Sequence, residues 1–387
     1  MISGADLNYP FSAFINGKML FLLYEPFTNG EGIKKGLAVK KKKTRTPGLF
    51  WPGIMLTVLI IFCMRDRRAG DFYATHLYPT VSSALSLAAS PFGFSLQMLM
   101  IAAFITAFIW IIVRNCRRRM GFFQCMLKIA TLVVWIFIWA YLGWCLNYSR
   151  SPVTTRTGAS CAAYDSTAFR AFLSEFTDKM NASWIPDVTM EETVMEKEIK
   201  DFYESVPRKY GLCSPRSWQH PKRMPLHRIE SAMGILGYMG PFFCESHLNP
   251  DIPPVEVPNT FAHEFSHLLG VSSEAEANWW AFQCCSRSSE PVMKYSGYLC
   301  MLPAVAGNAS RLLSEEDFHE WAGTIRHEVK DDYNSNREFW NSKRNRALDN
   351  VQKWIYDLFL KGNNISSGIM NYSEAVGLMM SLEYESD

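Results

Sequence analysis

Three long apolar runs dominate the N-terminal part of the chain. Residues 49–64, 94–113 and 122–146 hold almost no charged side chain, apart from Lys128 near the start of the third run. A helix needs about 20 apolar residues to cross a bilayer, and the shorter first run is bounded by Arg65, whose side chain can reach the headgroups. Continuous apolar runs also exceed the apolar stripe of a soluble helix. The pattern therefore predicts three transmembrane helices within a membrane region, residues 48–147.

The pattern changes after residue 150, where apolar positions recur with helical spacing. Helices are predicted at 190–206, which a capping box of Thr189 and Glu192 precedes, at 314–330, and at 342–360 with Gly362 as its stop. The apolar, glycine-interrupted segment 235–243 predicts an edge strand, to which an extended peptide could add. We therefore expect a mainly α membrane protein in which residues 150–387 form one α+β domain.

The net charge and the positions of the basic side chains indicate where the chain lies in the cell and which partners it contacts. The net charge of +2 gives no overall field that would attract nucleic acid. Basic side chains concentrate at residues 34–45 and 114–119, which the positive-inside rule places in the cytoplasm, although a further basic cluster at 65–68 lies on the opposite side. We expect a multi-pass protein of the cell membrane, in contact with the lipid bilayer. Residues 1–47 would form a basic cytoplasmic segment, and the C-terminal domain would lie outside the cytoplasm.

Cysteine usage is compatible with that location. Six cysteines follow residue 150, at positions 161, 213, 244, 284, 285 and 300. An even number outside the cytoplasm permits disulfides, and free buried thiols are the alternative. The sequence assigns no pairing.

A metal-binding pattern lies in the C-terminal domain. His263 and His267 are four residues apart and share one face of a helix, and Glu264 projects about 100° around it. This H-E-x-x-H arrangement is typical of zinc metallopeptidases, in which two imidazoles hold Zn²⁺ and the glutamate is the general base. The pattern predicts a metal-dependent hydrolase.

Local signals mark the ends of the motif helix. Pro258 and Asn259 supply a start and an N-cap, and Gly270 follows where a C′ glycine is expected. A buried apolar helix with two histidines and a glutamate is costly without a metal or paired partners. The alternative is a core helix whose histidines are satisfied by other groups.

Helix geometry orders the acidic residues after the motif. Ser273 and Glu276 fit a capping box, which gives Glu276 a structural role. Glu274 then occupies the first helical position, with Asn278 on the same face four residues later. We therefore assign Glu274 as the third metal ligand and Asn278 as an amide that orients a ligand, with Glu276 as the alternative ligand.

Several segments carry a family resemblance. They are Tyr78-Pro79, the stretches 146–150 (Leu-Asn-Tyr-Ser-Arg) and 241–245 (Pro-Phe-Phe-Cys-Glu), the block 263–278, and the stretches 295–299 (Tyr-Ser-Gly-Tyr-Leu) and 356–361 (Tyr-Asp-Leu-Phe-Leu-Lys). Together they resemble the bacterial membrane family known as domain of unknown function 3810, whose pattern usually has glycine where Cys244 lies. That family resembles zinc metallopeptidases, so the resemblance implies a zincin-like domain over residues 150–387.

A second, more distant likeness concerns residues 274–282, Glu-Ala-Glu-Ala-Asn-Trp-Trp-Ala-Phe. This segment resembles the E-x-E-A-N-x-F-A element of ImmA/IrrE-type regulatory peptidases and the E-x-x-x-D element of membrane CAAX-processing and Oma-type proteases. In those glutamate zincins (gluzincins) the first glutamate is the third zinc ligand, which implies the same role for Glu274. Only six residues separate His267 from Glu274, fewer than in those families, so the turn at Gly270 must be tight.

These features predict a membrane-anchored zinc metallopeptidase acting on a peptide or protein. One Zn²⁺ would be held by His263, His267 and Glu274, with Glu264 as general base for a zinc-bound water. The candidates to stabilise the oxyanion or line the cleft are Tyr295, Tyr298, His247, Glu245 and Arg228. Two alternatives fit the same residues: a zinc-dependent amide hydrolase of cell-wall peptides, and a zinc-stabilised receptor or scaffold without turnover.

Overall fold

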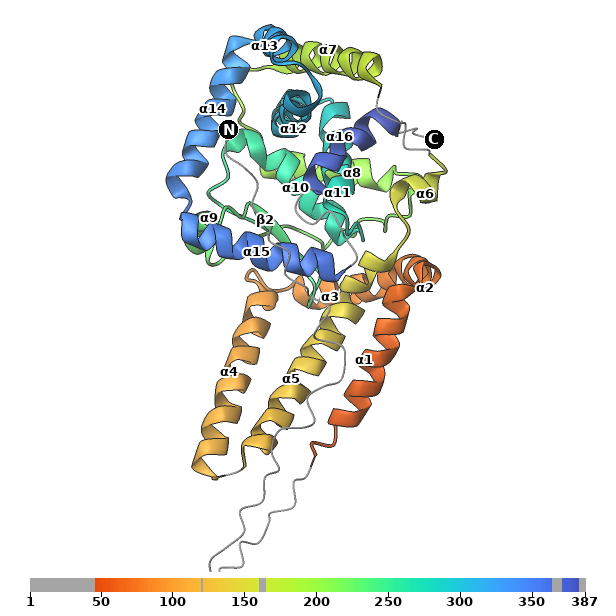
Figure 1. The fold of residues 1–387 in the computed structure, drawn as a ribbon, viewed down its shortest axis with the longest axis vertical. Helices are drawn as coiled ribbons and strands as arrows, with labels where there is room; N and C mark the ends of the chain where they lie inside the picture. The colour runs from red at the N-terminus through yellow and green to blue at the C-terminus, as the bar shows by residue number, and fades with distance from the viewer. Residues whose placement is uncertain (1–45, 120, 160–164, 364–370, 383–387) are drawn as a thin grey trace, which may run out of the picture. The chain divides into compact units, whose positions relative to one another are not determined.

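The apolar runs form three helices, α1 (Phe50–Arg65), α4 (Leu96–Arg117) and α5 (Phe122–Gly143), and both α1 and α4 pack against α5 (Figure 1). The computed structural model describes residues 46–119, 121–159, 165–363 and 371–382. Most of the predicted segment 1–47 lies outside the described residues.

Two of these helices, α4 and α5, are long and apolar enough to cross a membrane. Each has 22 residues, and at about 1.5 Å per residue this length covers a hydrocarbon core of about 30 Å. Helix α1 has only 16 residues, or about 24 Å. The prediction of three spans is therefore wrong: two helices of the described chain have the required length. Helix α1 ends because Asp66 leaves the helical backbone and accepts the N–H of Arg68 at the start of α2 (Arg67–Phe72).

A short helical layer connects α1 to α4. Helix α2 continues through the π-helical turn η2 (Tyr73–Leu77) into α3 (Tyr78–Ala89). The hydroxyl of Tyr73 donates to the carbonyl of Leu142 in α5 at 2.8 Å, and the hydroxyl of Tyr78 donates to the carbonyl of Leu268 at 2.8 Å. This layer therefore joins the apolar helices to the C-terminal domain.

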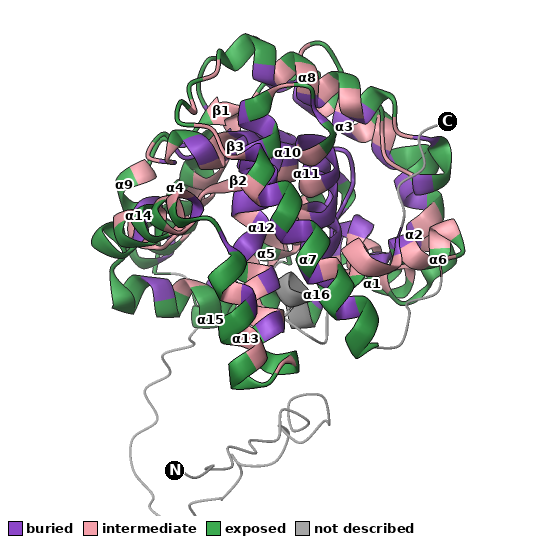
Figure 2. Cartoon of the chain, turned by 90° about the horizontal axis from the view of Figure 1, so that it is seen from above, coloured by how far each residue is buried: buried purple, intermediate pink, exposed green. Residues whose placement is uncertain are grey.

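The centre of the C-terminal domain is formed by α10 (Val257–Leu268), α11 (Glu274–Arg287) and α12 (Pro291–Leu312), and most residues of these three helices are buried (Figure 2). Helix α11 packs against α10, α12 and α16 (Asn371–Ser381), and buries Trp279 and Trp280 completely. The remaining helical segments are η3 (Cys145–Ser149), α6 (Val153–Thr157), α7 (Ser166–Ser183), α8 (Glu192–Glu204), η4 (Arg208–Tyr210), α9 (His227–Ala232), η5 (Pro254–Glu256), α13 (Glu315–Thr324), α14 (His327–Lys343) and α15 (Arg346–Gly362).

The predicted helices are present, but their boundaries differ. The helix expected at 314–330 is split into α13 and α14, because Asn181 of α7 accepts the N–H of Arg326 and donates to the carbonyl of Thr324. The capping box of Thr189 is wrong: Thr189 bonds to Asp187, and α8 begins at Glu192. Helix α15 ends at Gly362, the predicted stop.

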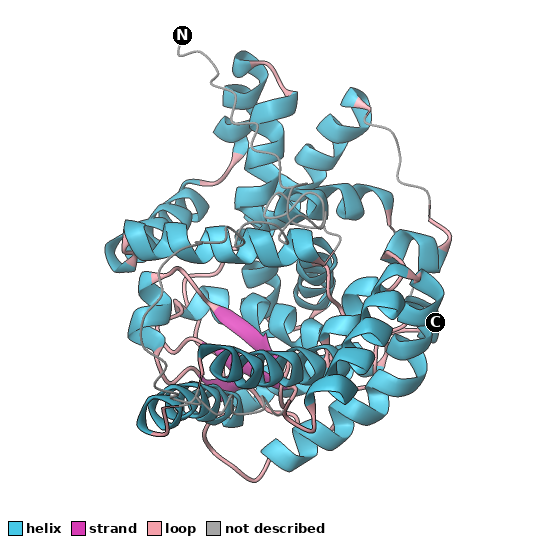
Figure 3. Ribbon diagram, turned by 60° about the horizontal axis from the view of Figure 1, so that its bottom comes forward, coloured by secondary structure: helices cyan, strands magenta, loops and turns pink. Residues whose placement is uncertain are grey.

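A three-stranded sheet lies beside the motif helix (Figure 3). Its order is β1 (Lys222–Arg223), β3 (Glu245–Leu248) and β2 (Gly237–Gly240), with β3 parallel to β1 and antiparallel to β2. The predicted edge strand is thus confirmed, but it is shorter than the expected 235–243: β2 comprises residues 237–240, at one edge of the sheet. All nine cysteines of the described residues are free, and Cys161 lies outside them.

The turn between β2 and β3 reaches the apolar helices. Phe242 accepts the indole N–H of Trp139 in α5 at 2.9 Å, and its own N–H donates to Gln97 in α4 at 3.1 Å. Cys244 in this turn has φ +49°, a left-handed conformation that favours glycine. The glycine usual at this position in the family that the sequence resembles would therefore suit the backbone.

Candidate metal centre

The motif helix α10 is almost entirely buried. The turn η5 runs directly into α10, so the helix starts at Val257 and Pro258 occupies its first turn. Asn259 is therefore not the predicted N-cap: it lies inside the first turn, and its N–H donates to Ser296 at 3.2 Å. Phe261 and Phe265 are fully buried and fix the helix against the core.

The C-terminal end of α10 orients one of the histidines. Gly270 has φ +99°, its N–H donates to the carbonyl of His267 at 3.0 Å, and the N–H of Val271 donates to the carbonyl of Ser266 at 3.1 Å. This is a Schellman motif, which reverses the chain within a few residues. The carbonyl of Val271 then accepts a hydrogen bond from Nδ1 of His267 at 2.7 Å. Nε2 of His267 is therefore left as the nitrogen that can bind a metal.

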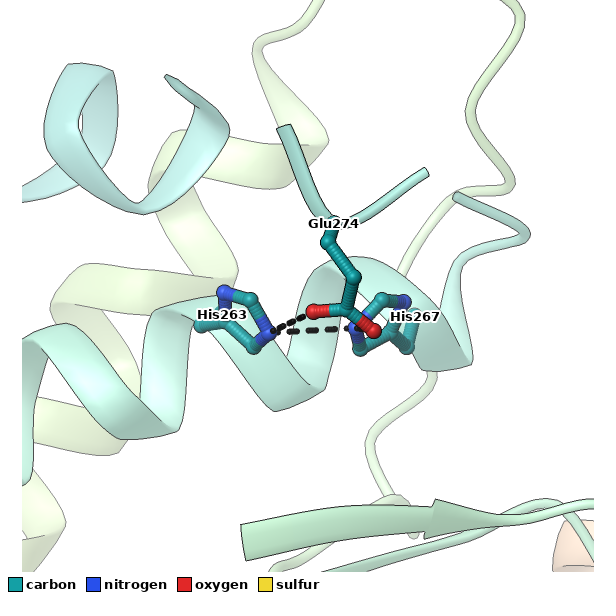
Figure 4. A group of neighbouring side chains, drawn as sticks. All are labelled: His263, His267 and Glu274. Atoms are coloured by element: carbon teal, nitrogen blue, oxygen red, sulfur yellow. Dashed lines mark hydrogen bonds and ion pairs between the residues drawn. The ribbon is translucent and has the colours of Figure 1, made fainter. Parts of the chain in front are cut away.

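The tight turn brings Glu274 back to the histidines (Figure 4). Nε2 of His263 lies 3.3 Å from Oε2 of Glu274 and 3.1 Å from Nε2 of His267, which is 3.7 Å from Oε1 of Glu274. One ligand atom from each residue lies within 4.8 Å of the others, and the group could hold a metal ion. The six residues between His267 and Glu274 are therefore enough for the chain to bring Glu274 back to the histidines.

The neighbouring Glu276 has different partners. The hydroxyl of Ser273 accepts its N–H at 3.3 Å, as a helix cap should, and its carboxylate accepts from Arg156 and from the indole of Trp280. The carboxylate of Glu276 is therefore engaged in a buried ion pair with Arg156 and not with the histidines. Asn278 was expected to orient a metal ligand, but among the contacts of the described residues none joins it to His263, His267 or Glu274. A tyrosine described below contacts Glu274 instead.

The charges of the site are strongly coupled. Burial lowers the pKa of His267, but the adjacent Glu274 carboxylate outweighs it and raises that pKa to about 9. Burial raises the pKa of Glu274, yet the two histidines hold it well below its usual range. Burial also raises the pKa of Glu264, against the two histidines, which lower it. Glu274 thus stays anionic beside Glu264, whose raised pKa makes its carboxylate more basic.

Glu264 lies against the edge strand. A Cβ atom added to Gly237 of β2 would lie 2.6 Å from Cγ and 2.8 Å from Oε1 of Glu264. Gly237 therefore leaves the space that the carboxylate occupies. The sequence showed this glycine only as an interruption of an apolar strand.

Comparison with known proteins gives one match. The model of a family described as a protein of unknown function, DUF3810, matches residues 73–380. The chain belongs to the DUF3810 family. No curated protein and no solved structure matches it. The part of this DUF3810 chain that matches contains α4, α5, the sheet and His263, His267 and Glu274.

Two tyrosines of the DUF3810 chain complete the surroundings of Glu274. The hydroxyl of Tyr356, on α15, donates to Oε1 of Glu274. Tyr148, just after α5, is largely enclosed, and its pKa is raised by burial and then by the charge of Glu274. Both tyrosines lie in segments that carry the family resemblance, which is the one signal in the sequence that pointed to them.

The other predicted cleft residues of the DUF3810 chain have structural partners. Tyr295 donates to Asp332 at 2.5 Å, and the ring of Tyr298 packs against Phe176 and Phe282. Glu245 accepts the N–H groups of Leu96 and Gln97 and pairs with Lys222, so it caps α4. His247 is fully buried, bonds to Ser95 at 2.8 Å and stacks on Tyr238. Arg228 is exposed on α9.

Proposed function

We propose that this chain is a membrane-anchored zinc metallopeptidase. The observation that carries the proposal is the convergence of His263, His267 and Glu274, with Glu264 on the same buried helix as the histidines. Two imidazoles and one carboxylate are a donor set of catalytic zinc sites, which leave a fourth position for water.

The spacing of the donor atoms fits zinc. Tetrahedral zinc with bonds of about 2.0–2.1 Å holds its ligand atoms roughly 3.3 Å apart. Nε2 of His263 lies 3.1 Å from Nε2 of His267 and 3.3 Å from Oε2 of Glu274, and the remaining pair, Nε2 of His267 and Oε1 of Glu274, is 3.7 Å apart. The hydrogen bond from Nδ1 of His267 to Val271 fixes the ring with its other nitrogen toward this group.

The reaction we propose is hydrolysis of a peptide bond. Bound zinc would supply a water of lowered pKa and polarise the substrate carbonyl. Glu264 takes a proton from the attacking water and transfers it to the leaving amine, a role suited to a carboxylate whose pKa burial raises. Strand β2, at the sheet edge and in contact with Glu264 through Gly237, would align an extended peptide by strand addition.

The membrane anchor we propose consists of α4 and α5. Their apolar side chains are largely exposed, among them Leu99, Ile105, Phe108, Ile109, Trp110 and Val133. A water-exposed apolar surface of this extent is costly, so lipid is its natural environment. The arginines at 114–119, in the last turn of α4 and just after it, favour a cytoplasmic loop between the two helices, with the candidate site on the opposite side.

The test uses the full-length chain in detergent or nanodiscs. We expect about one zinc per chain in the wild type and in Glu264→Gln, and much less in His263→Ala and Glu274→Ala, as catalytic zinc needs all three protein ligands. His319→Ala, which changes an exposed histidine, is the matched control. Cleavage of an unstructured peptide library should occur in the wild type and be lost in Glu264→Gln. Absence of metal from the wild type overturns the proposal. Metal without cleavage of the library overturns the peptidase and leaves the two alternatives, the hydrolase of cell-wall peptides and the scaffold without turnover.

A further inference from the structure

Helix α15 is amphipathic, and its apolar face points away from the protein. Val351, Trp354 and Ile355 expose 53%, 65% and 54% of their surfaces. The other large apolar side chains exposed on this face are Leu348, Leu358 and Phe359. A helix at the surface of a water-soluble domain shows the reverse arrangement, with its apolar face toward the core.

The polar face of α15 is the one that contacts the domain. Tyr356 donates to Glu274 of the domain, and Asp349, on the same side of the helix, is buried and accepts from Lys353 of the same helix at 2.8 Å. At about 100° per residue, Asp349 and Tyr356 project from the side opposite Val351 and Leu358. Tyr356 and the buried Asp349 therefore set the orientation of α15, which leaves Val351, Trp354, Ile355 and Leu358 exposed.

The C-terminal end of α15 is joined to the end of α5. The hydroxyl of Tyr141, in the last turn of α5, donates to Asn363 at 2.9 Å, and the ring of Phe359 lies 5.5 Å from that of Tyr148, just after α5. In Figure 1, α15 runs across the chain at the level where α5 enters the C-terminal domain. The C-terminal end of α15 therefore lies beside the end of the proposed membrane anchor.

The charges around α15 suit a lipid surface. Residues 343–361 contain five basic side chains and two acidic ones, so that the segment carries a net charge of +3. Helices that lie in the membrane interface combine basic side chains with an apolar face of tryptophan, phenylalanine and leucine. Trp354 is of the residue type enriched at the boundary between headgroups and acyl chains.

We propose that α15 lies in the interface of the bilayer that holds α4 and α5, with Val351, Trp354, Ile355 and Leu358 in contact with lipid. The position follows from the tie to Tyr141, which holds the C-terminal end of α15 at the end of a proposed spanning helix, and the basic side chains of residues 343–361 favour lipid as the occupant. The opposite face of the same helix holds Tyr356 against Glu274, so the lipid surface also sets the position of a residue at the metal centre. The inference rests on the membrane anchoring proposed above but not on catalysis.

The experiment places a photoreactive benzoylphenylalanine in the full-length chain, reconstituted in vesicles of phosphatidylethanolamine and phosphatidylglycerol. Ile355 is the test position, and Arg346, exposed on the side of the same helix opposite Ile355, is the matched control. Phe108, exposed on α4, is the positive control for membrane insertion. Mass spectrometry after illumination counts lipid adducts, and each variant must elute as a single species beforehand.

We expect lipid adducts at Ile355 comparable to those at Phe108 and several-fold more frequent than those at Arg346. Adducts at Phe108 without adducts at Ile355 overturn the inference and leave the membrane anchor standing. Cross-links from Ile355 to a second copy of the chain, or to another protein, overturn it as well and identify the other occupant. If Phe108 itself gives no lipid adducts, the membrane anchor of the proposed function fails together with the inference.

Discussion

Trp144 donates its indole N–H to the main-chain carbonyl of His267 across 2.8 Å, and both residues are buried. Trp144 directly follows α5, whereas His267 belongs to the candidate metal centre. Their rings also meet edge to face, with centroids 6.0 Å apart. The end of an apolar helix thus helps to hold the helix that carries the ligands.

Replacing Trp144 by phenylalanine keeps an aromatic ring but removes this donor. We expect Trp144→Phe to lower the stability by about 1–2 kcal/mol, because a buried carbonyl loses one of its hydrogen bonds. The midpoint of thermal unfolding in detergent measures the loss. Trp51→Phe, at a tryptophan 60% exposed on α1, should leave the midpoint unchanged. Equal midpoints for wild type and Trp144→Phe would show that the bond contributes nothing.

Gly237→Ala tests the position of Glu264. The added methyl group would lie 2.6 Å from Cγ of Glu264, so the carboxylate must move away. If Glu264 is the general base, we expect peptide cleavage to fall by about 10²-fold or more, as for other losses of general-base catalysis. Zinc content should stay at the wild-type level. Gly307→Ala, where a Cβ meets nothing within 4 Å, is the control. Unaltered cleavage in Gly237→Ala would contradict the role of this contact.

Tyr356→Phe removes the hydroxyl that donates to Glu274. Groups that orient a metal ligand typically contribute about 10–100-fold to metal affinity, so we expect the zinc dissociation constant to rise by about that factor. Competition with a chromophoric chelator gives the constant. Tyr298→Phe, in an aromatic cluster with Phe176 and Phe282, serves as the matched control. A similar change in both variants would indicate a general loss of packing.

His247 predicts a pH dependence of stability. Burial lowers its pKa to about 4, although Glu245 raises it, and Lys222 lowers it further. The unfolded chain takes up a proton near pH 6.5, whereas the folded chain does so only near pH 4. This contribution to stability is therefore complete above about pH 6.5 and is lost as the pH falls toward 4, with a total of roughly 3 kcal/mol.

The measurement compares thermal unfolding of wild type and His247→Gln at pH 7.5 and pH 5. Destabilisation on acidification should be smaller in His247→Gln, because glutamine does not titrate, while other groups contribute equally to both proteins. Parallel pH profiles would exclude His247 as a source of the dependence.

The convergence of the ligands was predictable because it is local. An interval of four residues places His263 and His267 on one helical face, and a glycine at position 270 allows the turn that returns Glu274. The choice of Glu274 over Glu276 depended on recognising the helix start at Ser273. Whether this group binds zinc and cleaves peptides remains a proposal.

The long-range contacts were not predictable. Tyr356 reaches Glu274 across 82 residues of sequence, and Asn181 separates α13 from α14 across more than 140. Glu245 was a candidate to line the cleft, but it caps α4, which lies about 150 residues away in the sequence. Tertiary partners decide such roles, and hydrophobic periodicity does not encode them.

The turn at Gly270 also determines how the donor set assembles. The three ligands fall within a dozen residues, so the entropy lost in bringing them together is small, since that cost grows with the length of the intervening chain. The donor set is therefore a property of one helical hairpin, α10 and α11. Substitutions far from this hairpin will therefore affect which other groups contact it more than they affect whether its three ligands come together.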